Sequence, residues 1–325
     1  MPSDNVFRKI VPIKKEEILL DHYSKIFVLG SCFVNHVGDR LANAGFDVLY
    51  PYGTIYNPIT MIRHLKRLNQ NIPYNKSDVV LSFGNYYSWH HSNVLRNENK
   101  DDLLTELNEQ VAELSFKLNE TDCIVISLGT SWVYEYPDFG IVGNCHKVPS
   151  KSFSKRILTI NEIMNEFSPF LKEMSDKTFL FTVSPVRHWA DGPVENTQSK
   201  SVLHLAIREL TNTFSNCFYF PSYEIMMDEL RDHRFYAQDM LHPSDEAIDY
   251  IWNRFKIFSM NSTTQNTIEK VEKVRAGISH KPFNPKSEQH QQFLSTLLKD
   301  IEKVNLLTPS YNWEKEKEQV TAQLM

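Results

Sequence analysis

Short apolar runs alternate with amphipathic segments from about residue 25 to residue 258, and this alternation constrains the fold more than any other feature. Strands and helices follow one another in this way in an α/β domain with a mainly parallel sheet. The runs that we predict to be strands are residues 25–30, 122–129, 178–185 and 217–221, with 46–50 as a fifth. The two weakly alternating segments 79–95 and 132–144 contain Gly, Pro or Asp and predict hairpin-like insertions near the edge or mouth of the sheet.

Apolar residues three or four positions apart predict helices between these strands. The clearest stripes are Val34, Val37, Leu41 and Ala44; Leu103, Leu107, Val111 and Leu114; and Ile160, Ile163, Phe167 and Phe170. A last helix is expected over 243–255, after which the polar run 259–267 indicates a boundary. We therefore predict an N-terminal arm (1–24), an α/β domain (25–258) and a helical C-terminal extension (259–325) with few residues suited to a core.

Composition excludes several classes of function. With 325 residues and 41% hydrophobic content, the chain can bury a substantial core. Its 35 basic and 40 acidic residues give a net charge of −5, so it lacks the cationic surface that nucleic acid binding needs. No signal peptide pattern and no membrane-length apolar run is present, which predicts a cytoplasmic protein without a membrane partner.

Four cysteines, Cys32, Cys123, Cys145 and Cys217, are scattered without a CxxC pair. This pattern predicts neither a disulfide framework nor a zinc site, and we expect reduced thiols and no metal. Cys145 and His146 are adjacent, but two ligands do not make a zinc site.

Two motifs bring together residue types that acyl transfer requires. Ser31 follows the first strand and precedes a helix, so it lies at a carboxyl strand end beside unpaired helix N–H groups. It is either a nucleophile or a simple helix cap. Asp239 and His242 precede the last helix. They are three residues apart, so a single turn of the chain can supply both a base and the carboxylate that orients it. The alternative is a capping Asp beside a His without a catalytic role.

These motifs resemble the SGNH (GDSL-like) hydrolase superfamily, and GSCFV at 30–34 is similar to the signature of the GSCFA family. Further matching blocks are 53–58, 126–134, 143–149, 184–192, 199–203, 220–244 and 250–252. The resemblance implies a three-layer α/β/α sandwich with a mainly parallel, flavodoxin-like sheet. It also implies a cofactor-free serine esterase that acts on a small-molecule or carbohydrate ester, with an acetyl ester favoured.

Carried over by position, the resemblance implies that Ser31 is the nucleophile, His242 the general base and acid, and Asp239 its orienting carboxylate. The backbone N–H groups of Ser31 and Gly53 would form the oxyanion hole. The superfamily's third-block amide is missing, because Gly129 is followed by Thr130, Ser131 and Trp132. A hydroxyl of Thr130 or Ser131, or the side chain of Asn144, could replace it; losing one donor costs about 3 to 4 kcal/mol.

Other side chains receive lesser roles. Cys32 cannot share a base with Ser31, because consecutive helical residues point about 100° apart, and we predict it to be packed as an apolar side chain. The substrate-binding candidates are Trp132, His146, Arg187 and His188. Arg187 either binds a substrate anion or pairs with Asp228 or Asp232. His36, His90 and His91 are expected to be ordinary surface or satisfied polar residues.

Three functions stay open at this point. The preferred one is ester hydrolysis by a Ser-His-Asp triad. An O-acyltransferase would use the same groups, and a non-catalytic ligand-binding protein would keep the scaffold without turnover. The oligomeric state is left open.

Overall fold

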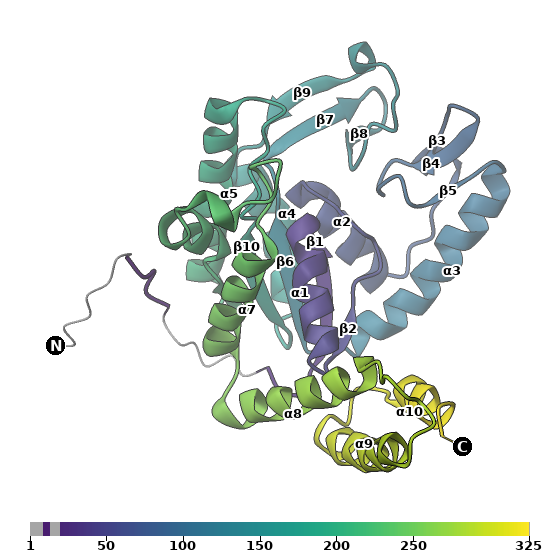
Figure 1. Cartoon of the computed structure of the whole chain (residues 1–325). Coiled ribbons are helices and arrows are strands. Elements are labelled where there is room, and N and C mark those ends of the chain that lie inside the picture. Colours follow the sequence, from purple (N-terminus) through teal and green to yellow (C-terminus); the bar gives the residue numbers. More distant parts are fainter. Residues whose placement is uncertain (1–8, 14–19, 325) are drawn as a thin grey trace.

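The computed structural model describes residues 9–13 and 20–324, and its centre is a five-stranded parallel sheet (Figure 1). The strand order is β11-β10-β6-β1-β2. The strands are β1 (Lys25–Gly30), β2 (Asp47–Leu49), β6 (Cys123–Leu128), β10 (Thr178–Val183) and β11 (Cys217–Tyr219). Each of the five predicted strands is present, so the prediction of an α/β fold with a parallel sheet is confirmed.

Helices cover both faces of this sheet. One face carries α1 (Cys32–Asn43) and α7 (Asp245–Ser259); the other carries α2 (Pro58–Asn69), α3 (Lys100–Asn119), α4 (Ile160–Glu173) and α5 (Pro193–Thr213). Because strand side chains alternate, Ile26 and Val28 pack toward α1, whereas Phe27 and Leu29 pack toward the opposite helices. The three predicted apolar stripes lie in α1, α3 and α4, which confirms them as core-facing helices.

Two small antiparallel sheets extend from one end of the molecule, opposite the C-terminal helices (Figure 1). One consists of β3 (Val79–Ser82), β4 (Asn85–Ser88) and β5 (Arg96–Asn97); the other of β7 (Trp132–Tyr136), β8 (Gly140–Val142) and β9 (Ser154–Ile157). The predicted hairpin insertions are therefore confirmed, and each gains a third strand. The short elements are η1 (Lys76–Asp78), η2 (Ser150–Ser152), α6 (Ser222–Glu224), η3 (Ile225–Glu229) and η4 (His233–Phe235).

The C-terminal helices have a hydrophobic core of their own, contrary to the expectation of few core residues. They are α8 (Ser262–Ser279), α9 (Glu288–Leu307) and α10 (Glu314–Thr321). Val271, Ile301 and Trp313 are among their fully buried side chains. The polar run 259–267 is not a long linker, because it ends α7 and begins α8 with Asn261 as the N-cap.

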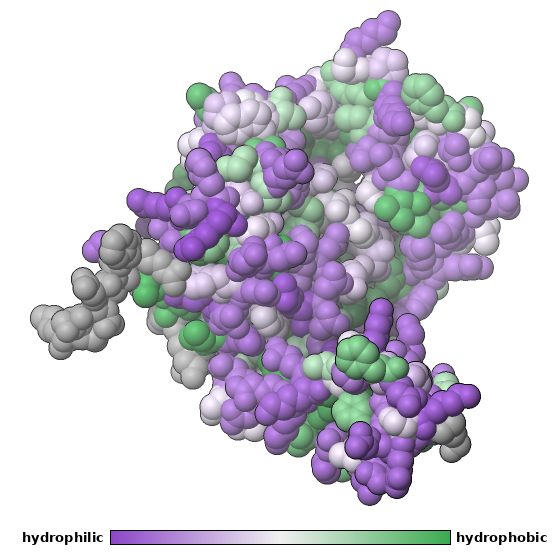
Figure 2. Space-filling view, in the orientation of Figure 1, coloured by the Kyte–Doolittle hydropathy of each residue, from purple (hydrophilic) through white to green (hydrophobic). Residues whose placement is uncertain are grey.

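Polar residues dominate the face of the molecule seen in Figure 2, and its apolar patches are small and separate.

Residues 1–8 and 14–19 of the predicted N-terminal arm lie outside the described residues. The described part packs beside α7. The Val11 N–H donates to Glu229 at 2.6 Å, and Arg254 donates to the Val11 carbonyl at 2.6 Å. The Leu20 N–H donates to the Ser259 carbonyl at 2.7 Å. The arm is thus fixed to the domain at two points.

Arg275 of α8 fixes the extension to the end of α1. Its guanidinium donates to the carbonyls of Asn43 at 2.6 Å and Ala42 at 3.1 Å, and to Glu316 at 3.1 Å. A cation at a helix C-terminus also complements the partial negative charge there. This one side chain therefore joins α1, α8 and α10.

Replacing Arg275 by Ala is expected to lower the free energy of unfolding by about 2 to 4 kcal/mol, since it leaves the buried Glu316 carboxylate without its cation and with only the hydrogen bond from the Tyr311 hydroxyl. Urea denaturation followed by circular dichroism measures this loss. The matched control is Arg231→Ala, whose ion pair with Asp228 is largely exposed and is expected to contribute at most about 1 kcal/mol. Equal losses in the two variants would contradict this account of the interface.

Candidate active site

The chain reverses its direction across the sheet at the carboxyl ends of β1 and β6. Helix α1 connects β1 to β2 on one face, whereas α4 and α5 connect β6, β10 and β11 on the other. Ligands bind in open α/β sheets at such a reversal, outside the carboxyl ends of the strands. The loop after β2 reaches the same edge, because Thr54 bridges to Gly30 and the Ile55 N–H donates to the Gly30 carbonyl at 2.8 Å.

Ser31 lies at this edge, but its polar groups turn toward β6. Its hydroxyl is 2.9 Å from the Ser127 hydroxyl, and its N–H donates to the Ser127 carbonyl at 3.0 Å. The residue is only 1% exposed, and its side chain makes no cap hydrogen bond to α1. The predicted use of the Ser31 N–H as an oxyanion donor is therefore wrong, because the extended β1–β6 ladder occupies it.

Asp239 and His242 form a hydrogen-bonded pair in the loop before α7. The Nδ1 of His242 is 2.6 Å from Asp239 Oδ2, while Asp239 Oδ1 accepts the N–H groups of His242 at 3.0 Å and Leu241 at 2.9 Å. These backbone bonds and the imidazole lower the pKa of Asp239 to about 2. The two side chains are 47% and 46% exposed, and Nε2 of His242 has no hydrogen-bond partner among the described residues.

Helix α7, which follows the Asp239–His242 loop, packs against α1, where Arg40 pairs with Asp249 at 2.5 Å. Burial raises the pKa of the Cys32 thiol, and the charge of Asp239 raises it further. Burial lowers the pKa of His36, and the charge of His242 adds to this lowering. Cys32 and His36 are four residues apart and share one face of α1. The two ends of the α/β unit are thus close together, although no hydrogen bond joins Ser31 to His242 in the described chain.

The hydroxyls of Thr130 and Ser131, which follow β6, form hydrogen bonds to α5. Thr130 Oγ1 is 2.9 Å from the Ser199 hydroxyl, and the Ser131 hydroxyl donates to the Ser199 carbonyl at 3.1 Å. Both residues are buried. The expectation that Thr130 or Ser131 replaces the missing amide donor is therefore wrong in this arrangement, because their hydrogen bonds are already made.

His146 is buried and hydrogen-bonded within the fold, and its contact with a substrate stays a prediction. Its Nδ1 is 2.9 Å from Asn93 Oδ1, its Nε2 is 2.7 Å from the Ser88 carbonyl, and burial lowers its pKa to about 4. Asn144 accepts the His146 N–H at 2.8 Å and so shapes the same turn.

Gly53, with φ of +61° in the loop beside β1, stays a predicted oxyanion donor.

Arg187 does not form either of the predicted ion pairs. Asp228 pairs with Arg231 at 3.0 Å, and Asp232 accepts the backbone N–H of Arg234 at 3.0 Å. The Arg187 guanidinium lies 5.2 Å from the centre of the Trp189 ring, and its buried Nε has no partner among the residues described. Binding of a substrate anion is the role that stays predicted for it.

Trp132 and His188 are partly exposed residues attached to the start of α5. The Trp132 indole donates to the Glu195 carbonyl at 3.2 Å, and the His188 N–H donates to Asn196 Oδ1 at 2.9 Å. Their contact with a substrate stays a prediction.

Lys200 is a residue near the site that the sequence interpretation missed. It is 2% exposed and donates to the carbonyls of Gly129 at 2.7 Å and Ser184 at 2.9 Å, at the ends of β6 and β10. Burial lowers its pKa to about 7. The sequence does contain a pattern that predicts the burial of Lys200. It precedes Leu203, Ile207 and Leu210 at helical spacing and so falls on the core face of α5.

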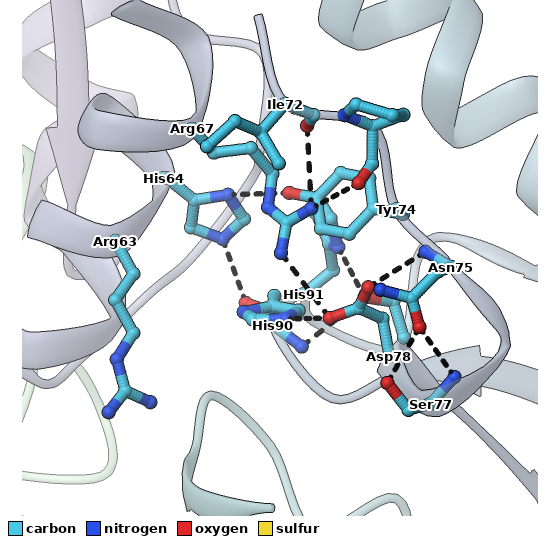
Figure 3. Close-up of polar contacts among 12 residues, drawn as sticks. Arg63, His64, Arg67, Ile72, Tyr74, Asn75, Ser77, Asp78, His90 and His91 are labelled. Carbon is cyan, nitrogen blue, oxygen red and sulfur yellow. Dashed lines mark hydrogen bonds and ion pairs between the residues drawn. The ribbon is translucent and has the colours of Figure 1, made fainter. Parts of the chain in front are cut away.

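A cluster of buried histidines, His64, His90 and His91, is drawn in Figure 3, and Tyr52, which precedes Gly53, packs against the rings of His64 and His91. His64 bonds to the His90 carbonyl at 2.9 Å and to the Tyr74 hydroxyl at 3.1 Å, and His90 pairs with Asp78 at 2.7 Å. His91 bonds to the Ser88 hydroxyl at 2.8 Å. Of the two alternatives predicted for His90 and His91, the surface position is wrong because both are buried, whereas His90, paired with Asp78, is a satisfied polar residue.

A cavity of about 890 Å³ lies at the C-terminal end of α1, away from the residues of the candidate active site. It is lined by Arg40, Asn43, Lys256, Arg275 and other residues at the C-terminal end of α1. Within residues 9–13 and 20–324, no group of three or more His, Cys, Asp or Glu side chains could hold a metal ion. The described helices include none with the length and apolar character needed to cross a membrane.

Comparison with protein families gives two matches. The GSCFA family model matches residues 25–255, and the model of the GSCFA domain protein, C-terminal domain, matches residues 271–325. Among curated proteins and solved structures, no match to the chain is found. The first model covers well over half of the chain, so this protein belongs to the GSCFA family.

Proposed function

We propose that this protein is an SGNH-type esterase, which transfers the acyl group of an oxygen ester to water. The observation that carries the proposal is the Asp239–His242 pair in the loop before α7, where Nε2 of His242 makes no hydrogen bond to any described residue. The order of the parallel strands, with helices on both faces, supports an SGNH-type sandwich. The resemblance of the matching sequence blocks favours an acetylated carbohydrate or another small ester as substrate.

In the proposed reaction, Asp239 accepts the Nδ1–H of His242 and so leaves Nε2 free to take a proton. A nucleophile at the β1–α1 junction loses its proton to Nε2 and attacks the ester carbonyl. His242 then protonates the departing alcohol, and a water molecule repeats the sequence to release the acid. The first N–H groups of α1, which lack intrahelical acceptors, lie where negative charge would develop.

His242→Gln is expected to lower kcat/KM for 4-nitrophenyl acetate by about 100-fold to 10,000-fold, the usual contribution of a general base. The matched control is His233→Gln, an exposed histidine in the nearby η4 turn, which should retain the wild-type rate. Circular dichroism checks that both variants fold. A His242→Gln variant as active as the control would refute the proposal.

A non-catalytic ligand-binding protein is the second candidate, and a specific observation favours it. The Ser31 N–H and the hydroxyls of Thr130 and Ser131 are all bonded within the fold, so fewer donors are available to an oxyanion. This candidate predicts that wild type and His242→Gln hydrolyse activated esters equally slowly. An O-acyltransferase would use the same groups with an alcohol in place of water.

A further inference from the structure

We propose that the nucleophile beside the Asp239–His242 pair is the thiol of Cys32 rather than the hydroxyl of Ser31. This inference rests on the proposed esterase function and changes the chemistry of its acyl-enzyme intermediate from an oxygen ester to a thioester. Four observations support it: the burial of Ser31, the accessibility of Cys32, the helix face that meets α7, and the groups around the sulfur.

Ser31 and Cys32 differ in what they contact. Ser31 is 1% exposed, and both its hydroxyl and its N–H bond to Ser127 of β6. Cys32 is only partly buried. Ser31 is the extended N-cap of α1, whereas Cys32 is its first helical residue. The hydroxyl of Ser31 is bonded to β6, and the partly exposed thiol of Cys32 does not share this bond.

The face of α1 that carries Cys32 is the one that packs against α7. Residues four apart lie above one another on a helix, so Cys32, His36 and Arg40 share this face. Arg40 pairs with Asp249 of α7 at 2.5 Å, and His36 lines a small cavity together with Ile248 and Trp252 of α7. Cys32 therefore begins the face of α1 that meets α7, the helix into which the Asp239–His242 loop leads.

The surroundings of the Cys32 sulfur suit a nucleophile that is activated only when its base acts. Burial raises the pKa of this thiol, so it is protonated at neutral pH and needs a base to remove its proton. Its own N–H and that of Phe33 favour the thiolate, as does the positive charge of Lys200. These groups would stabilise the negative charge that forms as His242 takes the proton.

The proposed chemistry balances without an added reactant other than water. The thiol proton moves to Nε2 of His242 while sulfur bonds to the carbonyl carbon. Collapse of the tetrahedral adduct breaks the C–O bond, His242 returns the proton to the alcohol, and a thioester on Cys32 is left. Water then attacks this thioester, giving a proton to His242, and the C–S bond breaks to release the acid and restore the thiol.

Kinetics of three variants test the assignment. Cys32→Ala is expected to lower kcat/KM for 4-nitrophenyl acetate by about 1,000-fold, whereas Ser31→Ala should lose far less activity. The matched control is Cys145→Ser, because Cys145 is the other partly buried thiol, lies in the loop after β8, and among the described residues forms no hydrogen bond to the Asp239–His242 pair. Thermal melting of each variant separates loss of chemistry from loss of fold.

Trapping the acyl-enzyme provides a readout independent of rate. The wild-type protein is mixed with 4-nitrophenyl acetate, quenched in acid, digested and analysed by mass spectrometry. An acetyl group on Cys32 that neutral hydroxylamine removes is the expected result, because this reagent cleaves thioesters and leaves oxygen esters. A hydroxylamine-resistant acetyl group on Ser31 would overturn the assignment.

The failure of this inference and that of the esterase proposal give different results. If His242→Gln and Ser31→Ala both lose activity while Cys32→Ala retains it, the esterase function stands and the Cys32 assignment falls. If His242→Gln retains full activity, the esterase function itself falls.

Discussion

Lowering the pH from 7 to 4 is expected to remove most of the stability of the fold, because three buried histidines resist protonation in the native state. Burial lowers the pKa of His64 to about 3, and it also lowers the pKa of His90 and, strongly, that of His91. In the unfolded chain each regains an ordinary pKa of about 6.5. The unfolded state then binds protons that the native cluster excludes.

The sign follows from proton linkage. Above about pH 6.5 the histidines are neutral in both states and contribute no pH dependence. Below that value the free energy of unfolding falls by about 1.4 kcal/mol per pH unit for each neutral histidine, until the native pKa is reached. A typical domain has only about 5 to 15 kcal/mol to lose, so protonation of these histidines in the unfolded state takes away a large share of its stability.

Urea denaturation at pH 7, 6, 5 and 4 measures this effect. The informative variant is His91→Phe, because Nε2 of His91 has no partner among the described residues and the substitution gives up only the bond to Ser88. It should reduce the slope of stability against pH by about 1.4 kcal/mol per unit. The exposed His233→Gln should leave the slope unchanged, and an identical slope in His91→Phe would exclude this origin.

Gly30→Ala is expected to destabilise the protein by at least about 3 kcal/mol. Gly30 has a φ of +144°, and an added Cβ would lie 2.2 Å from the backbone oxygen of Ser127 in the central strand β6. A paired core strand cannot shift to relieve this contact without breaking its hydrogen bonds. Because Ser31 and Cys32 follow directly, the same substitution should also abolish esterase activity.

The control for Gly30→Ala separates steric collision from backbone strain. Gly140 also has a positive φ, +86°, but nothing lies within 4 Å of its Cβ position. Gly140→Ala should therefore cost only about 1 to 2 kcal/mol, from the backbone conformation alone. Thermal and urea unfolding compare the two variants, and a similar loss in both would mean that contact with Ser127 is unimportant.

The positions of the strands could be predicted because a parallel strand covered on both faces is apolar at nearly every position. Residues 123–128, which are buried throughout, are the clearest case. Apolar residues three or four positions apart likewise predict α1 and α4. What the sequence could not indicate is that the hydroxyl of Ser31 is bonded to β6. That depends on the β1–β6 ladder continuing by one residue, through the Ser31 N–H, into the start of α1.

Contacts between distant segments explain the other differences. His64 lies in α2, whereas Tyr74 and His90 lie in loops after α2 and β4, and the fold brings the three together. Lys200 follows a pattern that predicts burial, but lysine is rarely buried unless its charge is satisfied. Its acceptors are carbonyls at the ends of β6 and β10, whose positions are set by the sheet and not by nearby sequence.

The openness of the Asp239–His242 pair affects the fate of an acyl-enzyme. Enzymes that pass acyl groups to a chosen alcohol exclude water by closing the site. Here both side chains are almost half exposed, so solvent reaches the base directly. In dilute solution hydrolysis should therefore outcompete transfer, and an acceptor alcohol would succeed only if it were large enough to shield the imidazole itself.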